Sequence, residues 1–320
     1  MTVDIPFTKM VGTGNDFLIV DTVQHPFAVA QGGVLSRGEG HRALGPLKTA
    51  WPRVARAMCD RRYGVGADGL LVLERSRVAS VRMRIFNPDG SEAEMCGNGA
   101  RCVARYLHER SRRKNRVTIN TKAGTLEALV AGERVAMHMP DPRRLRLSLQ
   151  VDADRRTFRL ASVDTGVPHA VAVIDRLDHV DVERIGRQLR FHQAFRPRGT
   201  NVDFIEVKRP DYLRIRTYER GVEAETLACG TGVAAAAVIH ALRTKAARVP
   251  RPRPRRITVE TKSGETLVVS LTVGNGRHRR QITNVTLEGA VRQICQGTFS
   301  WRTLPAPQRE AARQAGKGSR

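Results

Sequence analysis

The strongest constraint on the fold is a short motif that occurs twice. The stretches Cys96-Gly-Asn-Gly-Ala100 and Cys229-Gly-Thr-Gly-Val233 each follow a strand-like, partly acidic segment, and each opens a run of helical composition. A second pair of turns, Gly12-Thr13-Gly14 and Asp164-Thr165-Gly166, accompanies them in the same order. This order indicates one weak repeat in each half of the chain. If the halves face each other, the two Cys-Gly turns lie across one cleft.

Each Cys-Gly turn offers a thiol beside an anion site. Glycine lets the backbone approach a ligand closely, and a helix N-terminus leaves N–H groups unpaired and carries partial positive charge. Such a site suits a carboxylate, and the same field favours thiolate over thiol. A single copy would be read as a tight turn with a small buried cysteine. Two copies in a duplicated frame favour function.

Two thiols around one carboxylate site suit the inversion of a carbon centre. A thiolate can remove the proton next to the carboxylate while a thiol on the other face returns one. Cys96 and Cys229 are therefore the candidate catalytic pair. No cysteine or histidine cluster has zinc spacing, and Gly64-x-Gly66-x-x-Gly69 precedes a strand, unlike a dinucleotide fingerprint. We therefore expect no metal and no cofactor.

The composition limits the other classes of function. The chain has 320 residues, enough for two domains, and five cysteines, an odd number that argues against a disulfide framework. Its formal charge of +24 alone would suit a nucleic-acid-binding protein. The basic residues are scattered, however, and only 5% of the chain is aromatic, so base stacking has little support. We expect an arginine-rich surface and no specific nucleic acid.

Neither a secretory signal nor a membrane span is indicated. No charged-then-apolar segment precedes a cleavage site near the start of the sequence. The longest mostly apolar run, Leu227 to Leu242, is too short to cross a bilayer. We therefore expect a cytoplasmic protein that does not contact a membrane.

Hydrophobic periodicity predicts alternating strands and helices. Strands are expected at Ile5–Met10, Asp16–Asp21, Leu70–Glu74, Val81–Phe86, Val117–Thr121, Thr125–Val130, twice within Val163–Ile174, and at Asn201–Val207, Leu213–Tyr218, Ile257–Thr261 and Thr266–Leu271. Helices are expected at Val54–Asp60, Ala100–Arg110, Val182–Leu189 and Val233–Arg243. A surface insertion at Gln24–Pro52, a Pro/Arg loop at Val249–Arg256 and a disordered tail complete the expected organisation.

Seven motifs, in order along the chain, resemble those of the diaminopimelate epimerase family. They are Met10-Val-Gly-Thr-Gly-Asn-Asp-Phe17, Gly64-Val-Gly-Ala-Asp68, Phe86-Asn-Pro-Asp-Gly-Ser-Glu92, Cys96-Gly-Asn-Gly-Ala-Arg-Cys102, Gly166-Val-Pro-His169, Tyr218-Glu-Arg-Gly221 and Cys229-Gly-Thr-Gly232. The resemblance implies an α/β (α+β) fold of two pseudo-symmetric domains, each a barrel-like mixed sheet around a central helix, with the active site in the interdomain cleft. The expected domains are residues 1–140 plus about 283–301, and residues 141–282, with 302–320 as the tail.

The resemblance also implies an activity and residue roles. The activity is a cofactor-independent, two-thiol interconversion of LL- and meso-2,6-diaminopimelate, in lysine and peptidoglycan precursor biosynthesis, by a homodimer. Cys96 and Cys229 would exchange protons with the substrate, and His169 and Glu219 would tune the thiols. The implied substrate contacts are Asn15, Asn87, Gly97, Asn98, Asn201, Glu219, Arg220, Gly230 and Thr231.

Several alternatives stay open from the sequence. Gly69 and Val167 stand where the family often has Gln and Asn, which leaves the substrate less defined than the reaction. Another pyridoxal-independent amino-acid racemase of the same fold, a basic nucleic-acid-binding protein and an inactive fold relative remain alternatives. Individual residues also have simpler interpretations: Glu219 and Arg220 could form a surface pair, and His169 could cap a strand.

Overall fold

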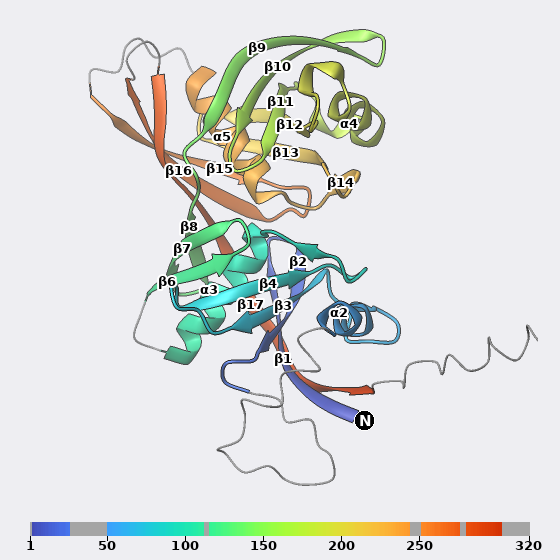
Figure 1. Cartoon of the computed structure of the whole chain (residues 1–320). Helices are drawn as coiled ribbons and strands as arrows, with labels where there is room; N and C mark the ends of the chain where they lie inside the picture. Colours follow the sequence, from blue (N-terminus) through green and yellow to red (C-terminus); the bar gives the residue numbers. More distant parts are fainter. Residues whose placement is uncertain (1, 26–49, 112–114, 244–250, 276–279, 303–320) are drawn as a thin grey trace, which may run out of the picture.

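The computed structural model describes residues 2–25, 50–111, 115–243, 251–275 and 280–302. The chain forms two halves, one above the other, that are joined by a long strand (Figure 1). The N-terminal half contains β1 (Thr2–Gly12), β2 (Asn15–Asp21), α2 (Trp51–Cys59), β3 (Gly69–Glu74), β4 (Val81–Phe86), β5 (Glu92–Ala93), α3 (Gly97–Ser111), β6 (Arg116–Thr121), β7 (Gly124–Ala131) and β8 (Arg134–His138).

The C-terminal half repeats this order. It contains β9 (Arg143–Ala153), β10 (Arg156–Asp164), β11 (Pro168–Val173), α4 (Val182–Arg190), β12 (Asn201–Arg209), β13 (Tyr212–Glu219), β14 (Ala224–Thr226), α5 (Gly230–Arg243), β15 (Arg253–Glu260) and β16 (Thr266–Asn275). Short 3₁₀ turns at Leu177–His179 and Gln193–Phe195 flank α4.

Strand pairing shows that the repeat extends to the topology. In the N-terminal half β2 runs parallel to β3 across α2, and β4 runs parallel to β6 across α3. In the C-terminal half β11 runs parallel to β12 across α4, and β13 runs parallel to β15 across α5. The hairpin pairs β1–β2, β3–β4 and β6–β7 match β10–β11, β12–β13 and β15–β16. The halves are therefore two copies of one mixed-sheet unit, as the sequence repeat predicted.

The central helix of each half lies inside its sheet. Residues of α3 pack with the inner faces of β1 to β8 in one hydrophobic core, and residues of α5 pack with β10 to β17 in another. Helix α5 is buried continuously from Gly232 to Leu242, which explains why its sequence is apolar on nearly every side. Helices α2 and α4 cover the outer faces of the sheets with cores of their own.

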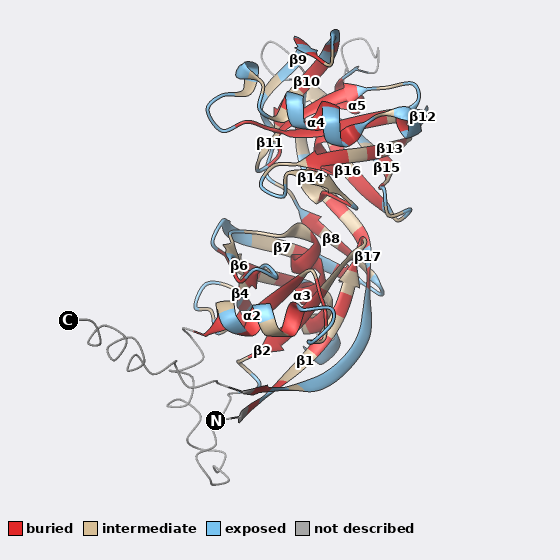
Figure 2. Cartoon of the chain, turned by 90° about the vertical axis from the view of Figure 1, so that its right-hand side faces the viewer, coloured by how far each residue is buried: buried red, intermediate tan, exposed pale blue. Residues whose placement is uncertain are grey.

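Strand β17 (Arg280–Arg302) connects the two halves. It pairs with β16 in the C-terminal half, then with β8 and finally with β1 in the N-terminal half. Its stretch 292–298 is exposed along the outside of the molecule (Figure 2). The chain thus returns to its first half at its end, and the domain boundaries expected at residues 140 and 283 stay a prediction.

The predicted helices and strands are present, but some boundaries and assignments were wrong. The Pro/Arg stretch expected to be a loop contains the start of β15 at Arg253, because these residues pair with β16. Trp51 and Pro52, assigned to the insertion, begin α2. Cys295 is exposed on β17. Most of the insertion and the tail lie outside the described residues.

Among the described residues, no helix combines the length and apolar character needed to cross a membrane.

Candidate active site

Both repeated cysteines occupy the N-cap position of a central helix. The Cys96 carbonyl accepts a hydrogen bond from the Ala100 N–H at 2.9 Å, and the Cys229 carbonyl accepts one from Val233 at 2.9 Å. The Gly99 N–H also donates to Cys96 Sγ at 3.4 Å. The sulfur therefore takes the place that a side-chain oxygen has in an ordinary N-cap. This confirms the prediction that each Cys-Gly turn opens a helix.

The starts of the two central helices lie against each other between the halves. A Cβ added at Gly230, the first residue of α5, would be 3.9 Å from both Asn98 Oδ1 and Arg101 Nη1 of α3. A Cβ added at Gly14 in the β1–β2 turn would be 2.9 Å from Ser263 Cβ of the other half. Glycine at position 14 permits the closer of these two approaches. The predicted carboxylate site thus has both helix starts beside it.

On the C-terminal side, four side chains form a continuous hydrogen-bonded chain behind the thiol. Cys229 Sγ lies 3.4 Å from Thr231 Oγ1, which lies 2.9 Å from His169 Nε2. His169 Nδ1 lies 2.7 Å from Asp203 Oδ2, and both of these side chains are fully buried. Thr217 Oγ1 donates to the second Asp203 oxygen at 2.8 Å. His169 is therefore held by the carboxylate and does not cap a strand.

On the N-terminal side, amide groups take the place of this chain. Asn98 Nδ2 donates to Asn15 Oδ1 at 2.7 Å, and Asn15 Nδ2 donates to Asp68 Oδ2 at 2.9 Å. Arg101 Nη2 donates to Asn98 Oδ1 and to Thr13 Oγ1, both at 2.7 Å. Both predicted asparagines are thus fixed at the start of α3, and a buried arginine orients one of them.

The two thiols differ in their electrostatic surroundings. Burial raises the pKa of Cys96, and the Glu219 carboxylate raises it further, while the Gly99 N–H and the Arg101 charge oppose the rise. Burial raises the pKa of Cys229 well above its ordinary value, and the carboxylates of Glu219 and Asp203 add to this. Glu219, whose own pKa burial raises, therefore raises the pKa of both thiols, and its role as a tuning residue stays a prediction.

Two other predicted contacts, Asn87 and Asn201, have side-chain partners of their own. Asn87 is exposed after β4, and its Nδ2 donates to Ser91 Oγ at 2.9 Å. Asn201 Nδ2 donates to the Pro168 carbonyl at 3.0 Å, and its Oδ1 accepts from the Arg220 N–H at 2.8 Å. Asn201 therefore ties the strand that carries His169 to the Glu-Arg-Gly turn. Their roles toward a substrate stay predictions.

Sequence reasoning missed Asp203 and Arg101. Asp203 stands on β12 between Val202 and Phe204, all of which are buried. An acidic residue in a strand buried on both faces requires a partner, and that was the available signal. Arg101 lies within a quoted motif, but an arginine in a predicted helix carries no sign of its burial.

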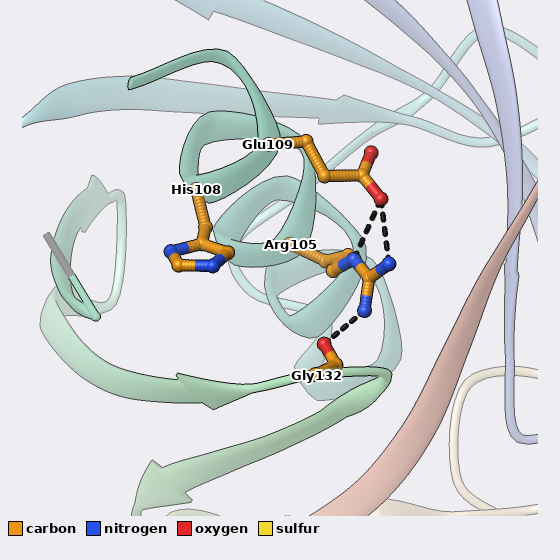
Figure 3. A pocket seen from close by; sticks show the side chains of 4 residues that line it. All are labelled: Arg105, His108, Glu109 and Gly132. Atoms are coloured by element: carbon orange, nitrogen blue, oxygen red, sulfur yellow. Dashed lines mark hydrogen bonds and ion pairs between the residues drawn. The ribbon is translucent and has the colours of Figure 1, made fainter. Parts of the chain in front are cut away.

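The hollow drawn in Figure 3 is a different feature. Four residues line it: Arg105, His108 and Glu109 on the later turns of α3, together with Gly132. The Arg105 guanidinium is already bonded to the Glu109 carboxylate and the Gly132 carbonyl. None of these residues belongs to a Cys-Gly turn, so this hollow is not part of the candidate site.

Two solved structures share the fold of this chain. The chain superposes on a Bacillus anthracis phenazine biosynthesis protein of the PhzF family with a TM-score of 0.64 and 18% identity, covering 92% of this chain and 99% of the other. It superposes on a probable proline racemase from Agrobacterium radiobacter K84 with a TM-score of 0.61 and 17% identity, covering 96% and 95%. The chain therefore shares the two-domain fold of these structures.

Comparison with known sequences shows the family to which the chain belongs. The family model described as diaminopimelate epimerase matches residues 7–145 and 161–287. A diaminopimelate epimerase from Chlorobaculum tepidum is 39% identical over 91% of this chain and 100% of its own length. One from Archaeoglobus fulgidus is 42% identical over 73% of this chain and 81% of its own. The chain belongs to the diaminopimelate epimerase family.

Proposed function

We propose that the protein is an epimerase that interconverts LL- and meso-2,6-diaminopimelate with Cys96 and Cys229 as its two acid/base groups. One observation carries this proposal: both cysteines cap the central helix of their half, and the two helix starts meet between the halves. Family membership supplies the substrate. A single thiol at a helix start would not explain why the arrangement is duplicated.

The chemistry balances with the two thiols alone. The thiolate of one cysteine takes the proton from the α-carbon, and the electron pair of the C–H bond moves into the carboxylate to give an enediolate. The thiol of the other cysteine then gives its proton to the opposite face of the same carbon. The stereocentre is inverted, and thiol and thiolate have changed places. Positioned acid and base groups of this kind contribute about 10²- to 10⁴-fold to a rate.

The helix starts would stabilise the charge that develops on the carboxylate. Backbone N–H groups of Gly97, Asn98, Gly230 and Thr231 lie in the first turns of α3 and α5, where donors are unpaired and the helix dipole is positive. Donors fixed before the reaction stabilise an enediolate more than the less charged ground state. The acidity of the α-hydrogen is thereby raised without an electron sink.

The second amino-acid end of the substrate needs polar partners farther from the thiols. Arg220 is half-buried beside Glu219 at the end of β13, and its N–H is held by Asn201. A guanidinium offers a planar fork for a carboxylate. We assign Arg220, with Asn87 and Asn201, to that end of the substrate.

We further propose that the protein works as a cytoplasmic homodimer without a cofactor. Support comes from the family resemblance and from the exposed stretch 292–298 of β17, in which Ile294 is 56% exposed. An exposed strand with an apolar side chain is a candidate contact between subunits. Light scattering on the purified protein measures the oligomeric state directly, and a monomer at micromolar concentration would contradict the dimer.

Epimerase assays on cysteine variants test the function. Purified wild-type protein should convert LL-diaminopimelate to the meso form with no added cofactor. Cys96→Ala and Cys229→Ala should each lower kcat by about 10³-fold or more, because either one removes an acid/base group. Cys59→Ala, at a buried cysteine of α2 outside both Cys-Gly turns, is the matched control and should keep wild-type turnover. Full turnover in either of the first two variants would refute the two-thiol assignment.

A further inference from the structure

Arg101 is a fully buried cation with no counter-ion in the described part of the chain. Its side chain is 0% exposed, and Nη2 makes its two hydrogen bonds to Thr13 and Asn98. The remaining donors, Nε and Nη1, have no hydrogen-bond partner. Burying an unpaired charge is costly, so an arginine kept in this state calls for a functional explanation.

The guanidinium lies between the elements that build the active site. A Cβ added at Gly230 would be 3.9 Å from Nη1, and a Cβ added at Gly289 of β17 would be 3.3 Å from Nε. Arg101 is thus enclosed by its own helix, by the first residue of α5 and by the strand that joins the halves. The two nitrogen atoms without a hydrogen-bond partner, Nε and Nη1, therefore lie where the starts of α3 and α5 meet.

The charged and titratable groups that act on Arg101 are few. They are the thiols of Cys96 and Cys102 on its own helix and the carboxylate of Glu265 from the other half. Glu265 forms its own ion pair with Arg292 at 3.6 Å. Cys102 is 0% exposed, and burial raises its pKa to about 12. Cys96 is partly exposed, so it is the neighbouring thiol that solvent reaches, and the Arg101 charge lowers its pKa against the effect of burial.

The repeat shows that this cation serves only one of the two thiols. Arg101 stands five residues after Cys96, and the position five residues after Cys229 is Ala234. Ala234 is buried in the apolar core around α5. The duplicated frame does not require an arginine at this position, because the C-terminal copy folds without one.

We propose that Arg101 is a positioning residue that makes Cys96 the more acidic of the two catalytic thiols and fixes Asn98 at the carboxylate site. It acts through these two residues and does not contact the substrate. Only the use of the ionised thiol rests on the proposed function, since ionisation can be measured without a substrate. Cys96 would then be the thiolate and Cys229 the thiol in the free enzyme.

The charges around each thiol point in the same direction. For Cys96 they are Arg101, which lowers its pKa, and Glu219 from β13, which raises it. For Cys229 they are Glu219 and Asp203, which both raise its pKa. Removing the Arg101 charge should therefore raise the pKa of Cys96. The acidic limb of the kcat/KM profile, which reports formation of the thiolate base, should move to higher pH.

The test is the pH dependence of thiol alkylation in the intact protein. Iodoacetamide labelling is followed for each cysteine by peptide mass spectrometry, because the exposed Cys295 also reacts. In Arg101→Gln the pKa of Cys96 should rise by about 1, and that of Cys229 should stay unchanged. Arg101→Lys, which retains a charge, should restore most of the difference. Arg105→Gln, a paired arginine on the same helix (Figure 3), is the matched control and should change neither thiol.

The outcomes separate this role from a purely structural one. An unchanged Cys96 pKa in Arg101→Gln, or an equal shift of both thiols, would overturn the proposal. If Arg101→Gln does not fold, the wild-type protein still decides, since a Cys96 pKa at or above that of Cys229 would also overturn it. A wild-type protein with the expected thiol order but no epimerase activity would instead refute only the proposed function.

Discussion

The two halves share a backbone plan but surround their cysteines with different chemistry. Phe17 pairs with Gly69 between β2 and β3, and in the other half His169 pairs with Asn201 between β11 and β12. Histidine and asparagine in the C-terminal half thus stand where the N-terminal half has phenylalanine and glycine.

The same contrast continues under the first helical turn. A Cβ added at Gly99 would be 3.1 Å from a Leu71 methyl group, and one added at the equivalent Gly232 would be 2.5 Å from Asp203 Oδ1. Arg101, a cation, corresponds to Ala234. The N-terminal half therefore has a buried positive charge, Arg101, near its cysteine. The C-terminal half instead has the Asp203 carboxylate and the His169 imidazole, which reach Cys229 through the Thr231 hydroxyl.

The difference shows how a symmetric fold can serve a reaction whose two proton-transfer groups differ at every moment. One thiol must be ionised while the other is protonated. With identical surroundings, neither arrangement would be preferred in the free enzyme. Opposite charges next to Cys96 and Cys229 break that equivalence, while the shared helix starts keep the same carboxylate within reach of both.

Among the variants that compare the two halves, the largest effect is expected from removing a link of the hydrogen-bonded chain behind Cys229. Thr231→Val keeps the shape of the side chain but removes the hydroxyl between His169 and the thiol. We expect kcat to fall by about 10²-fold, since proton movement at this thiol loses its support. Thr231→Ser retains a hydroxyl and should stay within a few-fold of wild type. Steady-state kinetics of both variants measure these changes in kcat. A wild-type kcat for Thr231→Val would show that the hydrogen-bonded side chains behind Cys229 are dispensable.

A smaller effect on stability compares the two helix starts. Gly232→Ala would press a methyl group against Asp203 Oδ1, and we expect it to lower the free energy of unfolding by about 2 kcal/mol. Gly99→Ala meets the movable Leu71 methyls, with Cys96 Cβ at an ordinary 3.7 Å, and it gains helix propensity, so its change should lie within about 1 kcal/mol. Denaturant unfolding of the two variants measures both values. Equal losses would mean that the halves are equivalent here after all.

The duplicated motif made the catalytic part of the fold predictable. The two turns placed the starts of α3 and α5 to within three residues, because glycine and a capping residue signal a helix start locally. The order of strands around them followed from apolar runs such as that of β3. The cysteine pair was therefore predictable from the residues themselves, whereas the fold class followed from the resemblance of the seven motifs to the diaminopimelate epimerase family.

Long-range features were not predictable in the same way. Strand β17 pairs with three strands in two halves, and Asn284, with a φ of 54°, and Gly289 interrupt its alternation. Strand β9 does alternate, with leucines at 145, 147 and 149, and that signal was overlooked beside the expected domain boundary. Asp203 and His169 lie 34 residues apart in sequence, so only the parallel pairing of β11 with β12 brings them together.

The most direct test of the two-thiol account is deuterium labelling in D₂O at low conversion. LL-diaminopimelate is incubated with wild-type protein, and substrate and product are separated and analysed by mass spectrometry. Two thiols on opposite faces predict one deuteron at the inverted carbon of nearly every product molecule and almost none in the recovered substrate, because the base keeps the original proton while the other thiol delivers a solvent-exchanged one. Product that retains the substrate's own proton would contradict the account, since a single group would then have served both faces.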